Sequence, residues 1–291
     1  MVVMVEELVK VSVRNLSHHK ARTALTLLGV IIGIASVVAL VSLGEGLTNS
    51  ISNSIEQLGA DNIFVAPRSS GGFGPPSSSA SLSQKDLDAV KGVRNVDIAM
   101  PLLFKSLPVK YNSKTSTVTL LGFPIEDSKR FFSDVQHFTI AQGRDLRAGE
   151  KSSVVLGWRV YKDAFGEDMR LGANIEMAGK KLRIVGILAE TGNSQSDSSM
   201  IMSIETLRDI TDSQKDHMTM ILVKTVGDPK GTAKAIEDKL EDVHKEKFFV
   251  AMTTDQVLNQ INQMFGVISI VLAGIAGISL LVAAFGIMNT M

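Results

Sequence analysis

Two long stretches without a charged side chain constrain this chain more than any other feature. No Asp, Glu, Lys or Arg occurs at residues 23–44 or 256–291. The first stretch has 22 residues, about 33 Å as an α-helix, which matches a hydrocarbon core of about 30 Å. The mainly apolar part of the second, residues 264–288, has 25 residues and spans the core with some tilt. The pattern predicts two transmembrane helices.

A buried core helix and a signal peptide account less well for these stretches. Helices buried in a soluble core seldom exceed about 20 uncharged residues. The apolar region of a signal peptide usually ends within about 15 residues, which is shorter than the first stretch. No A-x-A-like cleavage site occurs before Gly44-Glu45-Gly46 either.

The charges beside the first span predict its orientation. Four basic residues precede it, and the segment 45–255 carries 26 of the 30 basic and 28 of the 30 acidic residues. The positive-inside rule therefore places residues 1–22 in the cytoplasm and residues 45–255 on the other side of the membrane. The charges of 45–255 do not oppose this orientation, because long loops cross the membrane largely regardless of their charge. We therefore predict a cell-membrane protein with an extracytoplasmic domain. Zero net charge excludes a basic nucleic-acid binder, and the absence of Cys excludes disulfides.

Apolar spacing predicts how the segments around the first span are organised. Residues 1–22 include an amphipathic helix on the cytoplasmic surface, or a plain extension of the first span. Beyond Gly44, apolar residues recur every three or four positions up to Gly59. We expect the first span to continue as a stalk helix that ends at Gly59, and the second span, 256–291, to begin as a similar stalk.

The exported segment alternates strand-like and helical patterns. Residues 62–67 read as the first strand, and a Gly/Ser/Pro-rich flexible loop follows at 68–81. Helices are predicted from Ser83, which resembles the start of a capping box, and from Pro229 to His244. A hairpin is predicted around Gly179. Further strands are expected at 96–100, 116–121, 153–156, 173–177, 181–188, 200–202, 218–224 and 248–250. The fold class is an α+β extracytoplasmic domain, residues 45–255, inserted between two transmembrane helices.

Motifs for enzymatic chemistry are absent from the sequence. It contains no H-E-x-x-H, no G-x-S-x-G, no EF-hand spacing and no Gly-Lys-Ser/Thr tripeptide. Three histidines in the exported segment, His137, His217 and His244, are isolated from one another. Acidic residues from Glu237 to Asp242 alternate with lysines, as on a solvated, salt-bridged helix face. We expect no catalytic, metal or cofactor site in this chain.

Small residues in the two spans are the only candidate site residues. Gly29 and Gly33 form a G-x-x-x-G pair in the first span, and Ala273 and Gly277 form a similar pair in the second. Such spacing lets helix backbones approach closely in lipid, although glycine is also simply frequent in membrane helices. Neither span holds an ionisable residue, which argues against ion-coupled transport through them.

Several motif blocks resemble those of MacB-type (FtsX-like) ABC transporter permeases. The most specific block is at the N-terminus, where Arg14-Asn15-Leu16 precedes residues 20–38 and Leu43-Gly44-Glu45-Gly46. Further matching blocks are 58–63, Gly143-Arg144-Asp145, Val155-Leu156-Gly157, Leu171-Gly172, 184–188, 278–282 and 286–289. Together these blocks cover both spans and the domain between them.

The resemblance implies a permease that works as a homodimer with ABC ATPase subunits. ATP hydrolysis on the partner would move the extracytoplasmic domain, for export or for mechanotransmission to another protein. The family has three spans after that domain, so the chain, which stops at Met291, is expected to be the N-terminal portion of a longer protein. The remaining expected partners are membrane lipid and, on the exported side, an adaptor whose existence the sequence leaves open, as it does the cargo.

Two further functions stay open. A two-span receptor whose extracytoplasmic domain senses a small ligand would share this topology. A membrane-anchored hydrolase is weaker, because no nucleophile, base or metal constellation occurs in the sequence.

Overall fold

The computed structural model describes residues 31, 34–35, 37–39, 41–46, 48–49, 51–52, 59, 61–68, 81–132, 139–192, 194–211 and 216–288. The chain divides into two compact units, Met1–Ile51 with Gln260–Met291, and Ser52–Asn259. The predicted N-terminal helix, most of the first span, the interior of the Gly/Ser/Pro loop and His137 lie outside the described residues.

The unit Ser52–Asn259 holds all ten strands of the described residues. The strands are β1 (Asn62–Pro67), β2 (Val96–Tyr111), β3 (Lys114–Phe123), β4 (Ile140–Gly143), β5 (Ser153–Leu156), β6 (Asn174–Met177), β7 (Lys180–Leu188), β8 (Ser199–Ser203), β9 (Met220–Thr225) and β10 (Phe249–Thr253). The helices are α3 (Gln84–Lys91), α4 (Ile125–Phe131), α5 (Trp158–Lys162), α6 (Ser194–Asp197), α7 (Ile204–Thr211), α8 (Pro229–His244) and α9 (Thr254–Met288), of which α9 continues beyond this unit.

The strands form one mixed sheet in the order β10-β1-β9-β2-β3-β8-β5-β7-β4, and β6 pairs with β2 and β7. Two pairs, β3 with β8 and β5 with β7, are parallel, and the others are antiparallel. The domain therefore combines strands and helices as predicted.

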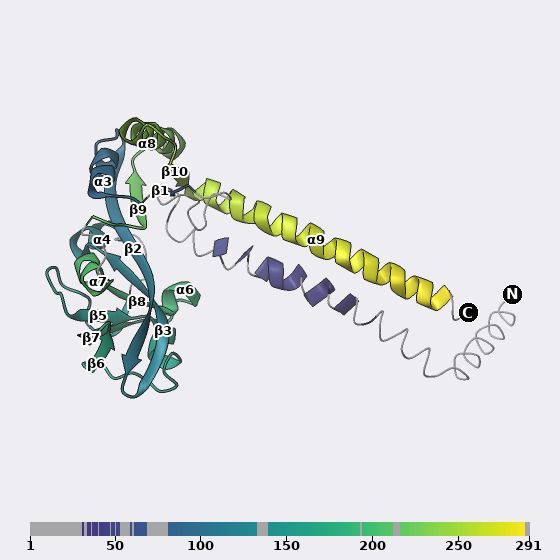
Figure 1. Ribbon diagram of the computed structural model, residues 1–291, viewed down its shortest axis with the longest axis horizontal. Coiled ribbons are helices and arrows are strands. Elements are labelled where there is room, and N and C mark those ends of the chain that lie inside the picture. Colours follow the sequence, from purple (N-terminus) through teal and green to yellow (C-terminus); the bar gives the residue numbers. More distant parts are fainter. Residues whose placement is uncertain are drawn as a thin grey trace. The chain divides into compact units, whose positions relative to one another are not determined.

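Two lobes share this sheet through β2 (Figure 1). Lobe A consists of β10, β1, β9 and the first half of β2, with α3 and α8. Lobe B consists of the second half of β2 with β3 to β8 and α4 to α7. Residues 96–102 of β2 pair with β9, whereas 103–111 pair with β3. With 16 residues and a rise of about 3.3 Å each, β2 gives both lobes a common backbone.

Each lobe has its own apolar core. In lobe A, strand residues such as Ile63 and Val223 pack with α3 and α8 residues such as Leu87 and Ile236. In lobe B, alternate residues of β2, β3, β5, β7 and β8 pack with residues of α5 and α7. The alternation follows from the two-residue period of a strand, which directs one set of side chains to each face.

Local sequence signals fix several element ends. Asp228 caps α8 by accepting hydrogen bonds from the backbone N–H groups of Lys230 and Gly231, and Pro229 takes the first helical position. Lys245, with φ of 60°, ends that helix. The predicted helix at Pro229–His244 is thus confirmed, and so is the hairpin, which joins β6 to β7.

Helix α9 is the one helix of the described residues that is long and apolar enough to cross a membrane. Its stretch Thr254–Ile275 has 22 residues with a mean hydropathy of 1.4, and none of the most apolar window is buried. The helix meets this criterion by its length and its composition. They agree with the second predicted span, although the apolar stretch begins nearer to the domain than residue 264.

The strand predictions were wrong in two places. Strand β2 continues to Tyr111 instead of ending at Met100, and β4 was not predicted at all. Pro101 and Pro108 interrupt the strand signal of β2, because proline cannot donate to a neighbouring strand. Both prolines nevertheless lie where β2 has a paired strand on only one side, β9 beside Pro101 and β3 beside Pro108.

Candidate functional site

The titratable side chains do not form a catalytic or metal constellation in the part of the chain that the structure describes. No group of three or more His, Asp or Glu residues there is placed to hold a metal ion. His217 and His244, which are isolated in the sequence, have separate surroundings in the structure. Burial lowers the pKa of His217, and the positive charges of Lys105 and Arg208 lower it further.

The imidazole of His244 contacts a buried carboxylate of the same lobe. Its Nε2 lies 2.5 Å from Oδ1 of Asp86, whose side chain is fully buried. The other carboxylate oxygen of Asp86 accepts hydrogen bonds from the backbone N–H and the hydroxyl of Ser83. The pair thereby ties the C-terminus of α8 to the N-terminus of α3, so we assign it to the stability of lobe A.

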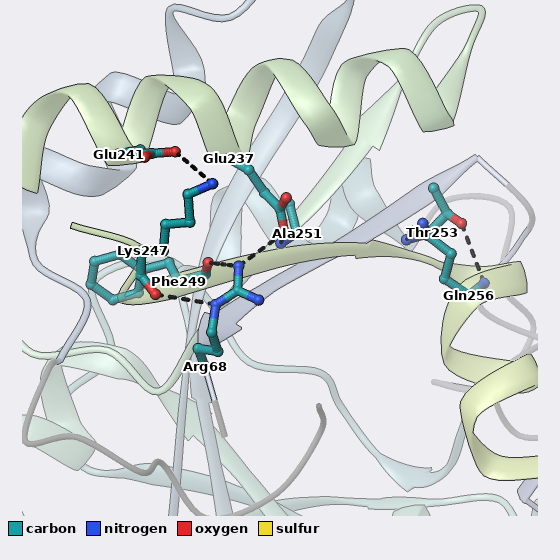
Figure 2. A network of polar contacts seen from close by, with 8 residues as sticks. All are labelled: Arg68, Glu237, Glu241, Lys247, Phe249, Ala251, Thr253 and Gln256. Atoms are coloured by element: carbon teal, nitrogen blue, oxygen red, sulfur yellow. Dashed lines mark hydrogen bonds and ion pairs between the residues drawn. The ribbon is translucent and has the colours of Figure 1, made fainter. Parts of the chain in front are cut away.

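A connected polar region lies where α9 begins. We call it the α9 root and define it as Gly59, Asn62, Thr253, Thr254 and Gln256. Here β10 becomes α9 without an intervening loop. Gln256 Oε1 accepts a hydrogen bond from the backbone N–H of Thr253 at 2.9 Å, and the Thr253 hydroxyl accepts one from the N–H of Gln256 at 3.3 Å (Figure 2). This reciprocal pair is a capping box, and it fixes the direction in which the helix leaves the strand.

Within the α9 root, a buried hydroxyl joins the start of α9 to the start of β1. The Thr254 hydroxyl donates to the carbonyl oxygen of Gly59 at 2.8 Å, and the carbonyl oxygen of Asn62 lies 3.4 Å from it. Thr253, Thr254 and Asn62 are all buried. Gly59 has φ of 102°, a backbone conformation that glycine adopts readily. The entry to β1 and the exit from β10 are therefore held together.

A second polar network holds the edge strand β10 along its length (Figure 2). The Glu237 carboxylate on α8 accepts a hydrogen bond from the backbone N–H of Ala251 at 3.0 Å. Because β10 stands at the edge of the sheet, this N–H has no strand partner, and the carboxylate satisfies it. Glu237 also lies 3.8 Å from the guanidinium of Arg68.

Arg68 binds the far end of the same strand. Its Nε donates to the carbonyl oxygen of Lys247 and its Nη2 to that of Phe249, both at 3.1 Å. Its backbone N–H donates to the carbonyl oxygen of Phe248 at 2.7 Å. Strand β10 is thus bound by β1, by Arg68 and by α8, so a displacement of the α9 root is resisted by the whole of lobe A.

What this arrangement can do is mechanical. The first turn of α9 belongs to the same compact unit as the sheet, and its bonds reach β1 and β10, the two outermost strands of lobe A. A pull or rotation applied to α9 would pass into the sheet through these strands. The site contains hydroxyls, amides and backbone groups, which position elements but do not carry acid–base chemistry at neutral pH.

The predicted helix-packing residues are only partly visible. Gly29 and Gly33 lie outside the described residues, whereas Ala273 and Gly277 lie on α9 and are exposed. A Cβ placed at Gly277 would have no neighbour within 4 Å. Their role in helix packing stays a prediction.

Glu237 and Thr254 were not predicted to be positioning residues. The predicted solvated, salt-bridged face fits Glu241, which lies 3.6 Å from Lys247, and also fits the ion pair of Glu237 with Arg68, but it did not include the bond from Ala251 to Glu237. The sequence did carry a signal for the α9 root, because Thr253 to Gln256 has the T-x-x-Q spacing of a capping box.

Comparisons with known proteins agree on one kind of domain. The sequence profile of a family described as MacB-like periplasmic core domain matches residues 23–243. An uncharacterized ABC transporter permease of Methanocaldococcus jannaschii is 29% identical over 288 residues, which cover 99% of this chain and 71% of that protein. The macrolide export ATP-binding/permease protein MacB of Shewanella sp. strain W3-18-1 is 31% identical over 297 residues, covering 98% of this chain and 44% of that protein.

A solved structure shows the same fold. The periplasmic region of MacB from Actinobacillus actinomycetemcomitans superposes with a TM-score of 0.58 at 19% identity, over 72% of this chain and 95% of that one. At that identity the likeness concerns the fold alone. The chain spans less than half the length of the Shewanella protein and about seven tenths of the Methanocaldococcus protein.

Proposed function

Because the chain belongs to the MacB-like periplasmic core domain family, we propose that it is the permease subunit of an ABC transporter. The membership confirms the resemblance that the motif blocks indicated. We propose further that ATP hydrolysis by a partner ATPase moves the extracytoplasmic domain, either for export or to act mechanically on another protein. The relatives named as ABC transporter permeases support this proposal.

The proposed location of the ATPase rests on the sequence. A phosphate-binding loop needs a Gly-Lys-Ser/Thr tripeptide, and the chain has none. The Shewanella relative is named as an ATP-binding/permease protein, and this chain matches 44% of it. We therefore place ATP on a partner ATPase and give this chain no catalytic residue.

The proposed topology has two parts. The basic residues before residue 23 favour a cytoplasmic N-terminus. Residues 23–44 and the apolar part of α9 are the proposed spans, and 45–255 is the proposed extracytoplasmic domain. The remaining proposed partners are a second copy of the permease, membrane lipid and, on the exported side, an adaptor.

The observation that carries the proposed mechanism is the α9 root. A helix that runs from an apolar stretch into the edge strand of a sheet transmits motion only if its first turn is held. Three features hold it: the capping box of Thr253 and Gln256, the Thr254 hydroxyl, and the bond from Ala251 to Glu237. In this mechanism ATP-driven motion of α9 moves lobe A, and β2 carries the motion to lobe B.

The test combines ATP turnover with a distance measurement on the full-length permease, reconstituted in lipid with its ATPase. Residues 1–291 contain no Cys, so Lys85→Cys, on the exposed face of α3, introduces one site for a spin label among them. We expect the protein to stimulate ATP turnover and the distance between two labels to change when ATP replaces ADP. Thr254→Val removes the hydroxyl and keeps the shape, and it should reduce the distance change while ATP turnover continues.

Thr117→Val, at an exposed position of β3, is the matched control and should behave like the parent. If Thr254→Val left the distance change intact, the α9 root would not be the path of coupling. If the parent protein stimulated no ATPase, the permease proposal would fail, and the two-span receptor would take its place.

A further inference from the structure

Lobe B has an apolar pocket on one face of its sheet, opposite the face that packs into its main core. In β5 and β8, Val154, Leu156, Met200 and Met202 face the core, so Val155 and Ile201 between them face the other way. A pocket of about 300 Å³ lies over that second face. Its apolar lining is Phe123, Ile125, Phe132, Leu146, Val155, Leu188 and Ile201.

Among the described residues, two elements form the walls of the pocket. Helix α4 contributes Ile125, Ser128 and Lys129 on one side, and the segment 143–150, which we call the strap, contributes Asp145 and Leu146 on the other. The strap crosses the sheet at Gly186, where a Cβ would collide with the carbonyl oxygen of Arg144. Only a residue without a Cβ lets the strap lie this close to the sheet.

An ion pair and backbone hydrogen bonds connect the two ends of the strap and fasten it to β7. Arg144 binds Glu150 through both guanidinium Nη atoms, at 3.0 and 2.6 Å, and the same carboxylate lies 3.3 Å from the backbone N of Arg147. The Arg144 N–H also donates to the carbonyl oxygen of Val185 at 2.9 Å. The wall of the pocket is therefore preorganised, a property that reduces the ordering cost of binding.

Opposite charges stand at the rim. Lys129 and Asp145 line the pocket and are exposed, and neither has an ion pair among the described residues. One oxygen of Asp145 accepts the N–H of Leu146 at 2.7 Å. The neighbouring hydroxyl of Ser128 donates to the carbonyl oxygen of Ile125 and is occupied. An apolar floor with one positive and one negative group at the pocket entrance suits a ligand that has an apolar chain and a head group carrying both charges.

We infer that this pocket binds a single-chain amphiphile, with its alkyl chain on the floor and its zwitterionic head between Lys129 and Asp145. The volume lies at the lower end of the range of about 300–1,000 Å³ for small-molecule sites, so one short chain fits. The binding is separate from the proposed coupling to an ATPase, because no residue of the pocket belongs to the α9 root.

The test is a titration of the whole chain with hexylphosphocholine, followed by NMR of Ile, Leu and Val methyl groups. An amphipathic polymer keeps the chain soluble without a competing detergent. Shifts should concentrate on Ile125, Val155, Leu188 and Ile201. Val154 and Ile184 serve as internal controls, because they lie on the core face of the same sheet.

Ligand variation separates the two ends of the molecule. Glycerophosphocholine, which has the head without the chain, and hexanol, which has the chain without the head, should both bind more weakly than hexylphosphocholine. If hexanol bound as tightly, the zwitterionic part of the inference would be overturned. Shifts spread over all exposed methyl groups would overturn the pocket itself.

Variants locate the head and the chain. Lys129→Glu and Asp145→Lys should each weaken binding about two- to fivefold, the size expected for partly exposed ion pairs, and Lys85→Glu on α3 should have no effect. Val155→Phe should block the chain. Lys129 and Asp145 are exposed, so the two rim variants should fold and can be measured even if Val155→Phe disturbs folding. Unchanged affinity in both Lys129→Glu and Asp145→Lys would overturn the inference.

Discussion

Ala178 holds a backbone conformation that alanine rarely adopts. It has φ of 45°, followed by Gly179 with φ of 77°, in the exposed two-residue turn between β6 and β7. Turns with two positive φ values favour Asn-Gly, because asparagine tolerates the left-handed region better than other residues with a side chain. Ala178→Asn should therefore stabilise the domain by about 0.5–1 kcal/mol, a part of the roughly 1–2 kcal/mol that the left-handed conformation costs a residue with a Cβ, as measured by urea unfolding.

The control at the same position is Ala178→Val. A β-branched side chain is poorly tolerated at positive φ, so this variant should unfold at a lower urea concentration than the parent. If valine were neutral here, the strain assigned to the turn would be absent.

Glu150 makes the stability of the strap depend on pH. The hydrogen bond from Arg144 is the main reason that the pKa of the Glu150 carboxyl lies below its usual value, about 4.3. A carboxyl whose pKa is lower in the folded state adds stability above its unfolded pKa, and this contribution disappears as pH falls through the folded pKa. Glu150→Gln should therefore lower the melting temperature at neutral pH, by about 1–3 °C.

Thermal unfolding of both proteins over a range of pH checks the sign. The difference between parent and Glu150→Gln should shrink as pH falls below about 4.3. Glu126→Gln, at an exposed position on α4, is the comparison. A difference that grew toward acidic pH would contradict the assignment.

Among the elements, the strap depends most sharply on one backbone position. Gly186 of β7 lies under the carbonyl oxygen of Arg144, and backbone atoms cannot move aside as a flexible side chain can. Gly186→Ala should destabilise the domain by about 2–4 kcal/mol, in the range of overpacking that forces a backbone shift. Gly92→Ala, whose Cβ would meet its nearest neighbour at 3.5 Å, should change stability by less than about 0.5 kcal/mol.

The element most affected by tertiary context is β2. Its prolines predicted a break, yet they sit where the strand changes partners, from β9 to β3, and where β6 has not yet joined. Where a strand is paired on one side only, a proline can be accepted if the position of its missing N–H lies on the unpaired side. This arrangement requires β9 and β6, both of which are distant from β2 in sequence, to be in place.

For the whole molecule, orientation in the membrane is the prediction to test. The chain has no Cys, so Lys85→Cys in lobe A and Lys10→Cys before the first span each introduce one thiol. A membrane-impermeant maleimide should label Lys85→Cys in intact cells and Lys10→Cys only after the membrane is opened, because basic flanks stay inside. The parent protein should stay unlabelled, and the reverse pattern would refute the proposed topology.

Part of the candidate site could have been predicted. The capping box at Thr253 and Gln256 is contained within four residues, so its spacing is visible in the sequence. The other contacts join residues far apart, since Thr254 and Gly59 are 195 positions apart and Arg68 and Phe249 are 181 apart. No local pattern specifies such pairs, because they depend on how β1 and β10 pair.

The sequence alone determined the features that depend on neighbouring residues. It predicted the second apolar helix, the bounds of α8, the hairpin of β6 and β7, and the family resemblance, because hydropathy, capping and turn chemistry act over a few positions. Tertiary structure decided how far β2 runs, which strand lies at each edge and why Glu237 is not simply solvated. It also created the pocket of lobe B, since a cavity exists only after separate elements pack and leave space between them.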